Sequence, residues 1–293
     1  MKFVLIREIR ILMKTILITG INGYLGSHLA KAFSTEYNII GLEYSLENLF
    51  RIEKCGYKVY AAKEGIPDTI FSDQAVDIIM HTATFYGRQN EEVKTIVNAN
   101  LFIPFELLDK AIKNNCTLFI NTDTVLDRFV STYALTKRHF QEWLYSRRNE
   151  IKVINMQLEH FYGPGCSNTN FITAMIERLK KNETSIDLTK GEQNRDFIYI
   201  DDIVTAYQTI IQRTSDIPDA FSEFQVSTNL LITIKDLMIT LKSLTKSSTI
   251  LNFGAIPYRE NELMHSETNN QPLKSLGWKP KFTIEQGLKN SCN

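Results

Sequence analysis

Short apolar runs alternate along this chain with longer segments in which apolar residues recur every three or four positions. The apolar runs are typical of buried strands and lie at residues 15–18, 38–42, 59–61, 76–84, 117–122 and 152–158. Helical periodicity is found at residues 98–114, 133–147, 171–181 and 201–213. Strands that alternate with helices predict an α/β fold with a doubly wound parallel sheet, covered by helices on both faces. Such sheets bind ligands at the carboxyl ends of their strands.

The stretch Thr19–Ser27 joins the first predicted strand to a helical segment and holds three glycines at a spacing of three. A pyrophosphate binds well at a helix N-terminus, provided that no Cβ blocks its approach to the backbone N–H groups. Gly20 would allow the turn, Gly23 the approach of the phosphates and Gly26 the packing of helix on strand. This context predicts a dinucleotide site, with a purely structural turn as the alternative. Further cofactor contacts are predicted at Asn22, Tyr24 and Leu25.

Glu43 ends the second apolar run and bears on the choice of dinucleotide. A carboxylate at this place accepts hydrogen bonds from the adenosine ribose hydroxyls of NAD and repels the 2′-phosphate of NADP. We therefore expect NAD(P)H as the cofactor, with a preference for NADH. Arg51 follows nearby and supplies a cation that would allow NADPH instead.

Tyr133 and Lys137 are four residues apart and therefore share one face of a predicted helix. A neighbouring ammonium favours the phenolate, so it lowers the pKa of the tyrosine and lets the phenol exchange a proton near neutral pH. Thr122 ends the fifth apolar run and is placed to hydrogen-bond the same substrate oxygen. The alternative for Thr122 is an ordinary hydroxyl at a strand end.

Composition and charge exclude several other classes of protein. The 293 residues carry a formal net charge of zero, so nothing in the balance indicates nucleic acid or an anionic membrane as a partner. The four cysteines have no paired spacing and the five histidines no cluster, which predicts cytoplasmic thiols and no bound metal. Residues 1–12 are interrupted by charges and are interpreted as an extension without signal or membrane character.

The glycine triplet, the Tyr133/Lys137 pair and the later segment Arg195–Asp202 together resemble the extended short-chain dehydrogenase/reductases of the NAD-dependent epimerase/dehydratase family. The resemblance covers residues 14 to about 290. It implies a Rossmann-type dinucleotide-binding domain at residues 13–162 and a smaller, interleaved substrate domain at residues 163–293, with segments such as 192–213 packing back on the first. It also implies a nucleotide diphosphate-sugar as substrate and a homodimer formed through a helix bundle.

The same resemblance implies a role for each matching residue. Tyr133 would be the acid/base, Lys137 its tuner and a ligand of the nicotinamide ribose, and Thr122 the hydroxyl partner. Implied cofactor neighbours are Ala83 and Asn100, and implied substrate contacts are Thr84, Tyr86, Asp123, His160, Arg195 and Arg259.

Several of these assignments carry alternatives. The two arginines match positions that pair with the substrate diphosphate, and surface ion pairs are the alternative for each. His160 stands where the family has asparagine, so it either contacts substrate or is only packed. Thr122 and Tyr133 are also closer in sequence than is usual in the family.

The tripeptide after the fifth predicted strand separates possible reactions. Sugar 4,6-dehydratases of the family carry Thr-Asp-Glu there, because elimination of water needs one carboxyl as acid and another as base. This chain has Thr122-Asp123-Thr124, so dehydration is not expected.

Segments 156–165, 191–197 and 258–262 further resemble the CDP-abequose and CDP-paratose synthases, which complete 3,6-dideoxyhexoses for bacterial O-antigens. This resemblance implies a cytoplasmic 4-ketoreductase that uses a CDP-4-dehydro-3,6-dideoxyhexose. The alternatives are an NAD-dependent nucleotide-sugar 4-epimerase, a reductase of another nucleotide 4-keto-6-deoxysugar, and a dinucleotide-binding protein without activity.

Overall fold

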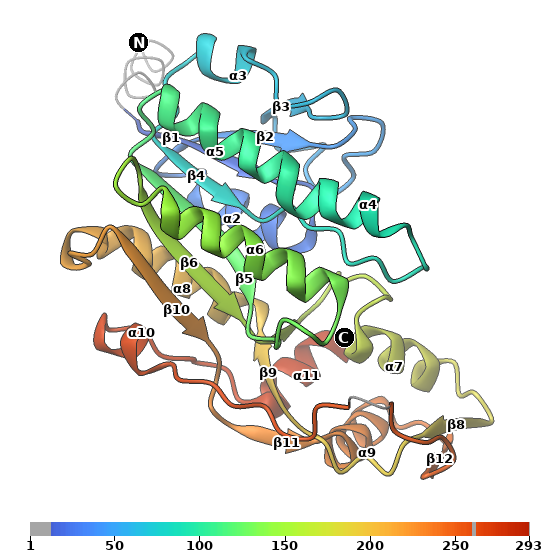
Figure 1. Cartoon of the computed structure of the whole chain (residues 1–293). Coiled ribbons are helices and arrows are strands. Elements are labelled where there is room, and N and C mark those ends of the chain that lie inside the picture. Colours follow the sequence, from blue (N-terminus) through green and yellow to red (C-terminus); the bar gives the residue numbers. More distant parts are fainter. Residues whose placement is uncertain (1–12, 260–261, 293) are drawn as a thin grey trace, which may run out of the picture. The chain divides into compact units, whose positions relative to one another are not determined.

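Seven strands form one sheet in the order β10-β6-β5-β4-β1-β2-β3 (Figure 1). The computed structural model describes residues 13–259 and 262–292, and the extension predicted at residues 1–12 lies outside them. In sheet order the strands are β10 (Phe221–Val226), β6 (Lys152–Leu158), β5 (Leu118–Thr124), β4 (Ile78–His81), β1 (Thr15–Thr19), β2 (Asn38–Glu43) and β3 (Lys58–Ala61).

Strands β3, β2, β1, β4 and β5 run parallel, with Leu17 beside Ile40 on one side and beside Ile79 on the other. The strand order reverses direction between β1 and β4, which is the place where doubly wound sheets bind dinucleotides. The structure thus confirms the predicted α/β fold.

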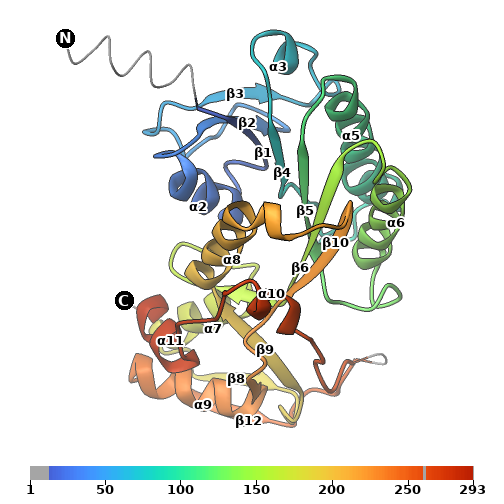
Figure 2. The same cartoon turned by 90° about the vertical axis from the view of Figure 1, so that its left-hand side faces the viewer.

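Helices cover both faces of this sheet. Figure 2 shows α2 (Tyr24–Phe33) on one face and α5 (Ile103–Lys113) with α6 (Thr132–Ser146) on the other. The apolar face of α5 packs on the sheet through Leu107 and Leu108, against a fully buried Phe119 of β5. Shorter helices of this region are α3 (Thr69–Ser72), α4 (Val93–Val97) and the π-helical turn η1 (Asn98–Phe102).

The fourth strand is shorter than the apolar run at residues 76–84 predicts. It ends at His81, because the N–H groups of Thr82 and Ala83 donate to the Thr19 hydroxyl, at 3.1 Å each. The chain that follows β4 therefore leaves the sheet next to the end of β1.

The chain divides into two compact units. The first comprises the chain through Gln157 together with Thr214–Phe224, and the second comprises Leu158–Arg213 and the chain from Gln225 onward. In the parts of the chain that the structure describes, no helix combines the length and the hydropathy of a membrane span.

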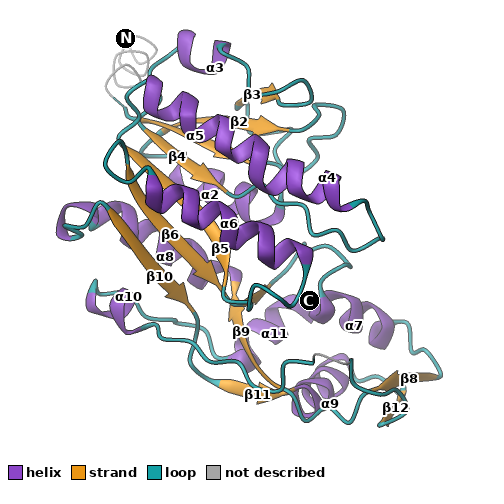
Figure 3. Ribbon diagram, in the orientation of Figure 1, coloured by secondary structure: helices purple, strands orange, loops and turns teal. Residues whose placement is uncertain are grey.

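The second unit contains two small sheets and a group of helices (Figure 3). Strands β7 (His160–Tyr162), β9 (Asn194–Tyr199) and β11 (Leu231–Thr233) form one sheet, and β8 (Ser185–Leu188) pairs with β12 (Ile250–Phe253). The helices are α7 (Phe171–Lys180), α8 (Ile200–Gln212), α9 (Ile234–Thr245), α10 (Gln271–Ser275) and α11 (Ile284–Cys292). The short η2 (Thr214–Asp216) belongs to the first unit.

We predict that Gly26→Ala lowers the free energy of unfolding by about 2 to 3 kcal/mol, because overpacking of this kind costs that much. A Cβ at Gly26 would collide with the carbonyl oxygen of Gly20, a backbone atom that has no alternative position. The matched control is Gly56→Ala, where a Cβ meets nothing within 4 Å and only the positive φ of 69° costs about 1 kcal/mol. Urea titrations of the three proteins measure the difference, and equal losses in both variants would contradict the packing argument.

Candidate active site

The three glycines lie where side chains have no room. Gly20 follows β1 with φ of +65°, and a Cβ there would come 2.9 Å from the Cα of Ala83. A Cβ at Gly23 would come 2.8 Å from the carbonyl oxygen of Gly20, and one at Gly26 would collide with that same oxygen. The turn therefore has no room for a side chain at any of the three glycine positions, as the sequence predicts.

Helix α2 begins directly after this turn. Its N-cap is Gly23, no side chain caps it, and its first turn holds no acidic residue. The N–H dipoles at this end thus meet no carboxylate within the helix, and the cradle fits the pyrophosphate of a dinucleotide. Of the other predicted contacts, Leu25 is buried and Tyr24 packs edge-on against His28.

Glu43 lies beside the glycine turn, at the end of β2. Its carboxylate accepts the backbone N–H of Asn22. Burial raises the pKa of Glu43, and bonds from the backbone N–H groups of Asn22, Tyr44 and Gly23 oppose that rise. The carboxylate therefore lies beside the glycine turn, as its predicted contact with the adenosine ribose requires.

Asn22 connects the turn to the segment after β2. Its Oδ1 accepts the N–H of Arg51 at 2.9 Å, and its Nδ2 donates to the carbonyl of Asn48 at 3.0 Å. The Arg51 guanidinium lies 3.4 Å from the Asn22 carbonyl oxygen. The structure thus brings the Glu43 carboxylate and the Arg51 guanidinium to the same turn, at Asn22.

Asn100 holds the loop that follows β4. Its Oδ1 accepts the N–H of Phe85 and its Nδ2 donates to the Phe85 carbonyl, both at 2.8 Å. The Thr84 hydroxyl donates to the same Oδ1 at 3.3 Å, and Asn100 Nδ2 also reaches Thr136 Oγ1 at 3.3 Å. The buried amide of Asn100 therefore anchors this loop to α6.

Tyr133 lies in the first turn of α6, which Ser131 caps by accepting the Ala134 N–H at 3.1 Å. The Tyr133 and Tyr86 ring centroids are 4.7 Å apart, and the Thr84 hydroxyl hydrogen-bonds the phenol. Burial is the main reason that the pKa of Tyr133 lies well above its ordinary value. The phenol is therefore protonated at neutral pH and can serve as a proton donor.

Lys137 lies one turn further along α6 and is almost fully buried. Burial lowers the pKa of Lys137, and the nearby Asp123 carboxylate opposes that shift. Arg88 lowers the pKa of Tyr133, an effect that the sequence assigns to Lys137. The roles expected for Lys137 stay predictions.

Asp123 belongs to a buried polar network that sequence reasoning missed. Its carboxylate accepts the Thr124 N–H at 2.8 Å and Asn155 Nδ2 at 2.9 Å. Asn155 Nδ2 also donates to Glu223 at 3.1 Å, while its Oδ1 accepts from Asn121 at 2.7 Å. The one available signal was the polar residues Asn155 and Gln157 at alternate positions of an apolar run. Thr122 lies half-buried in β5 beside this network.

The remaining predicted substrate contacts belong to the second unit. Arg195 is buried and forms an ion pair with Glu262 at 2.8 Å, so ion pairing, one of its two alternatives, is present, and substrate binding stays a prediction. Arg259 is exposed. His160 Nδ1 lies 3.0 Å from the buried Glu159 carboxylate, which also accepts a hydrogen bond from the Ser266 hydroxyl. Glu159 therefore fixes the orientation of the half-exposed imidazole.

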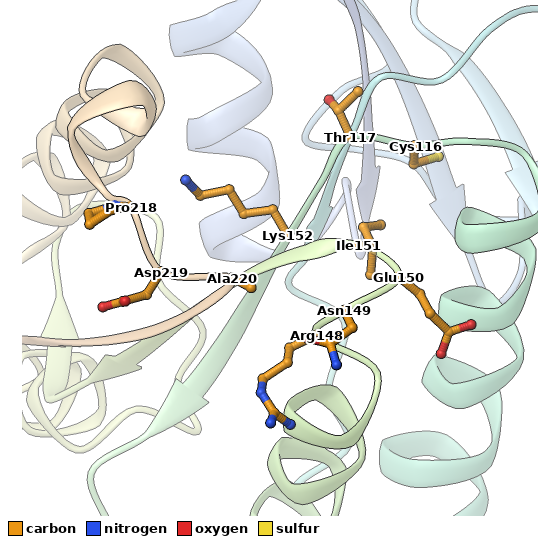
Figure 4. A pocket seen from close by; sticks show the side chains of 10 residues that line it. All are labelled: Cys116, Thr117, Arg148, Asn149, Glu150, Ile151, Lys152, Pro218, Asp219 and Ala220. Carbon is orange, nitrogen blue, oxygen red and sulfur yellow. The ribbon is translucent and has the colours of Figure 1, made fainter.

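A shallow pocket of about 390 Å³ lies in the first unit, beside the beginnings of β5 and β6 (Figure 4). None of the predicted site residues lines it. Its thiol, Cys116, is unreactive because burial raises its pKa to about 12. This pocket is therefore separate from the strand ends that carry the chemistry.

A doubly wound sheet with a glycine cradle at its switch point and a Tyr-Lys pair on α6, after β5, defines a dinucleotide-dependent oxidoreductase. The chain belongs to the NAD dependent epimerase/dehydratase family, whose model matches residues 16–222. This membership confirms the predicted family and its NAD-type cofactor.

Individual relatives agree with this assignment. The chain is 34% identical to a CDP-abequose synthase of Salmonella typhimurium over 94% of its own length and 97% of the relative's. It shares the fold of a UDP-glucose 4-epimerase from Thermotoga maritima, solved with UDP-glucose, with a TM-score of 0.84, 23% identity and coverage of 95% and 97%. A UDP-glucuronic acid 4-epimerase from Bacillus cereus, solved with UDP-glucuronic acid and NAD, gives a TM-score of 0.84 at 17% identity, covering 95% and 98%.

We predict that Glu43→Ala weakens NADH binding about tenfold, because hydrogen bonds to a charged group are worth about 1.5 kcal/mol or more. The same change removes the charge that repels a 2′-phosphate, so the preference shifts toward NADPH. Arg51→Met is the matched variant and should impair NADPH alone. Fluorescence titrations with both cofactors measure these affinities, and an unchanged NADH to NADPH ratio in Glu43→Ala would refute the role of the carboxylate.

Proposed function

We propose that this protein is a nucleotide-sugar 4-ketoreductase that acts on a CDP-4-dehydro-3,6-dideoxyhexose. Family membership and the 34% identity to a CDP-abequose synthase support an enzyme of the nucleotide-sugar reductase or epimerase type. The observation that favours reduction is the similarity to a CDP-abequose synthase. The proton transfer is assigned to Tyr133, whose phenol is protonated and lies one helical turn from Lys137 on α6. The cofactor is NAD(P)H, and Glu43 at the cradle favours NADH.

The chemistry follows from the described side chains. When bound, the reduced nicotinamide supplies a hydride to C4 of the sugar. Tyr133 donates its proton to the carbonyl oxygen, and Thr122 helps to hold that oxygen. The buried Lys137 would hydrogen-bond the nicotinamide ribose and would stabilise the anion that remains on Tyr133.

Thr124 argues against elimination of water as the reaction. It occupies the position at which a dehydratase needs its second carboxylate, and the one buried acid beside it, Asp123, already accepts hydrogen bonds from Thr124 and Asn155. A single carboxylate held in this way does not provide the acid and base pair of a dehydration.

In the first unit Thr84, Tyr86 and Asp123 lie around the Tyr133 phenol and would contact the sugar. In the second unit Arg195 and Arg259 would bind the diphosphate, for which planar guanidinium groups are suited. His160, oriented by Glu159, would contact the substrate through its exposed edge.

We predict that Tyr133→Phe lowers kcat by a factor of about 10² to 10⁴ and changes the Kd of NADH by less than about twofold, because it removes only the donated proton. The measurement is oxidation of NADH or NADPH with CDP-4-keto-3,6-dideoxyglucose, with NMR of the product. Near-wild-type turnover of the variant would contradict the assignment. Interconversion of two sugars with bound NAD and no added NADH would show an epimerase, and inertness with every nucleotide 4-ketosugar would show a binding protein.

We also propose that the protein forms a homodimer. Helices α5 and α6 lie side by side on one face of the sheet (Figure 1), where Phe105 and Trp143 meet with ring centroids 4.9 Å apart. Phe102 beside α5 is 62% exposed and Trp143 on α6 is 48% exposed, which is unusual for large aromatic side chains in one region. The helix bundle that the family resemblance implies would bury them.

We predict that Trp143→Glu converts a dimer into a monomer of 33.8 kDa, because a buried unpaired charge opposes association. Light scattering after gel filtration measures the mass. Ile250→Glu is the control, since Ile250 is 58% exposed but lies on β12 of the other unit. A wild-type protein that is monomeric at micromolar concentration would refute this interface.

A further inference from the structure

Tyr86 lies in contact with both Tyr133 and Arg88. Its ring centroid is 4.7 Å from that of Tyr133, and the guanidinium carbon of Arg88 lies over the Tyr86 ring, 4.3 Å from the centroid. The Arg88 cation is therefore within about 9 Å of the Tyr133 ring, close enough for a charge to act on the phenol. Tyr86 and Arg88 both come from the loop after β4, whereas Tyr133 lies on α6, far away in the sequence.

This loop is held on both sides of Tyr86. On one side Asn100 bonds both backbone groups of Phe85 at 2.8 Å. On the other side Gly87 has φ of +64° and packs so closely on Ile96 that a Cβ would collide with that side chain. The position of Tyr86 on Tyr133 is thus set by the fold.

We propose that Tyr86 and Arg88 are positioning residues for Tyr133. The Tyr86 ring contacts both the Tyr133 ring and the Arg88 guanidinium and so holds them in one cluster. The Arg88 cation stabilises the Tyr133 phenolate that remains after the proton is donated. In that step the O–H bond of Tyr133 breaks and its proton joins the carbonyl oxygen of the ketone. The ketone is reduced by the hydride and the nicotinamide is oxidised, so the negative charge stays on Tyr133 until a proton from solvent replaces the one donated.

The groups around Tyr133 explain why a cation such as Arg88 would help to stabilise its phenolate. Burial, Tyr86 and the Asp123 carboxylate of β5 all raise the pKa of Tyr133, whereas the Thr84 hydroxyl and Arg88 lower it. Lys137 on α6 is the other cation nearby, and burial lowers the pKa of its ammonium. Arg88 is exposed, so its charge carries no comparable desolvation cost.

The test titrates Tyr133 directly. Protein labelled with 3-fluorotyrosine, whose phenol is more acidic than that of tyrosine, is followed by ¹⁹F NMR against pH. The Tyr133 resonance is assigned by its absence in Tyr133→Phe. We expect Arg88→Met to raise the pKa of Tyr133 by about 0.5 to 1, the size of a single partly screened charge, and Arg88→Lys to leave it within about 0.3 of the wild type. Tyr86→Leu should move the Tyr133 resonance, because the ring that contacts Tyr133 is lost, whereas Tyr86→Phe should keep the cluster.

The proposal would be overturned if Arg88→Met titrates like the wild type, or if Arg88→Lys and Arg88→Met shift the pKa equally. NADH binding, measured by fluorescence, should be unchanged in all four variants. A kinetic arm rests on the proposed function: Arg88→Met should lower kcat about threefold to tenfold and move its pH profile with the titrated pKa. Because the NMR titration needs no substrate, its result stands even if the protein reduces no nucleotide ketosugar.

Discussion

The close approach of the Gly20 turn to Ala83 brings together the ends of β1 and β4, on which the rest of the site depends. The Thr19 hydroxyl accepts the N–H groups of Thr82 and Ala83, which fill its two acceptor positions. Its own proton is then left for His81 Nδ1, 2.8 Å away, so the imidazole is neutral with its proton on Nε2. Burial agrees with this, since it holds the pKa of His81 well below the ordinary value. One hydroxyl thus ties the cofactor cradle to the loop that reaches Tyr133.

Burial shifts the pKa values of Tyr133 and Lys137 in opposite directions, raising the first and lowering the second. It favours the neutral phenol of Tyr133 and the neutral amine of Lys137, because a charged group loses its hydration in both cases. A neutral phenol is what a proton donor needs. A neutral amine, in contrast, cannot stabilise an anion as an ammonium does. Asp123 offsets the effect on Lys137, and the amide of Asn155 keeps that carboxylate in place. The buried network therefore favours the protonated form of Lys137.

The segment Arg195–Asp202 illustrates how a motif serves structure within its own unit. The fully buried Asp196 accepts the N–H groups of Thr228 and Asn229, at 3.1 and 2.6 Å. Asp202 likewise accepts the N–H groups of Lys281 and Phe282. Both carboxylates replace water at turns that would otherwise leave backbone donors unsatisfied. Arg195 of the same segment is held by Glu262.

The sequence by itself determined the features that depend on near neighbours. The glycine spacing before α2, the carboxylate at the end of β2 and the pairing of Tyr133 with Lys137 follow from turn and helix geometry within a few residues. The tertiary structure decided the contacts between distant segments, such as Arg88 over Tyr86 beside Tyr133, and Asn155 between Asp123 and Glu223. Local spacing carries no information on these contacts, because parallel strands are joined through helices and their ends meet only when the sheet is assembled.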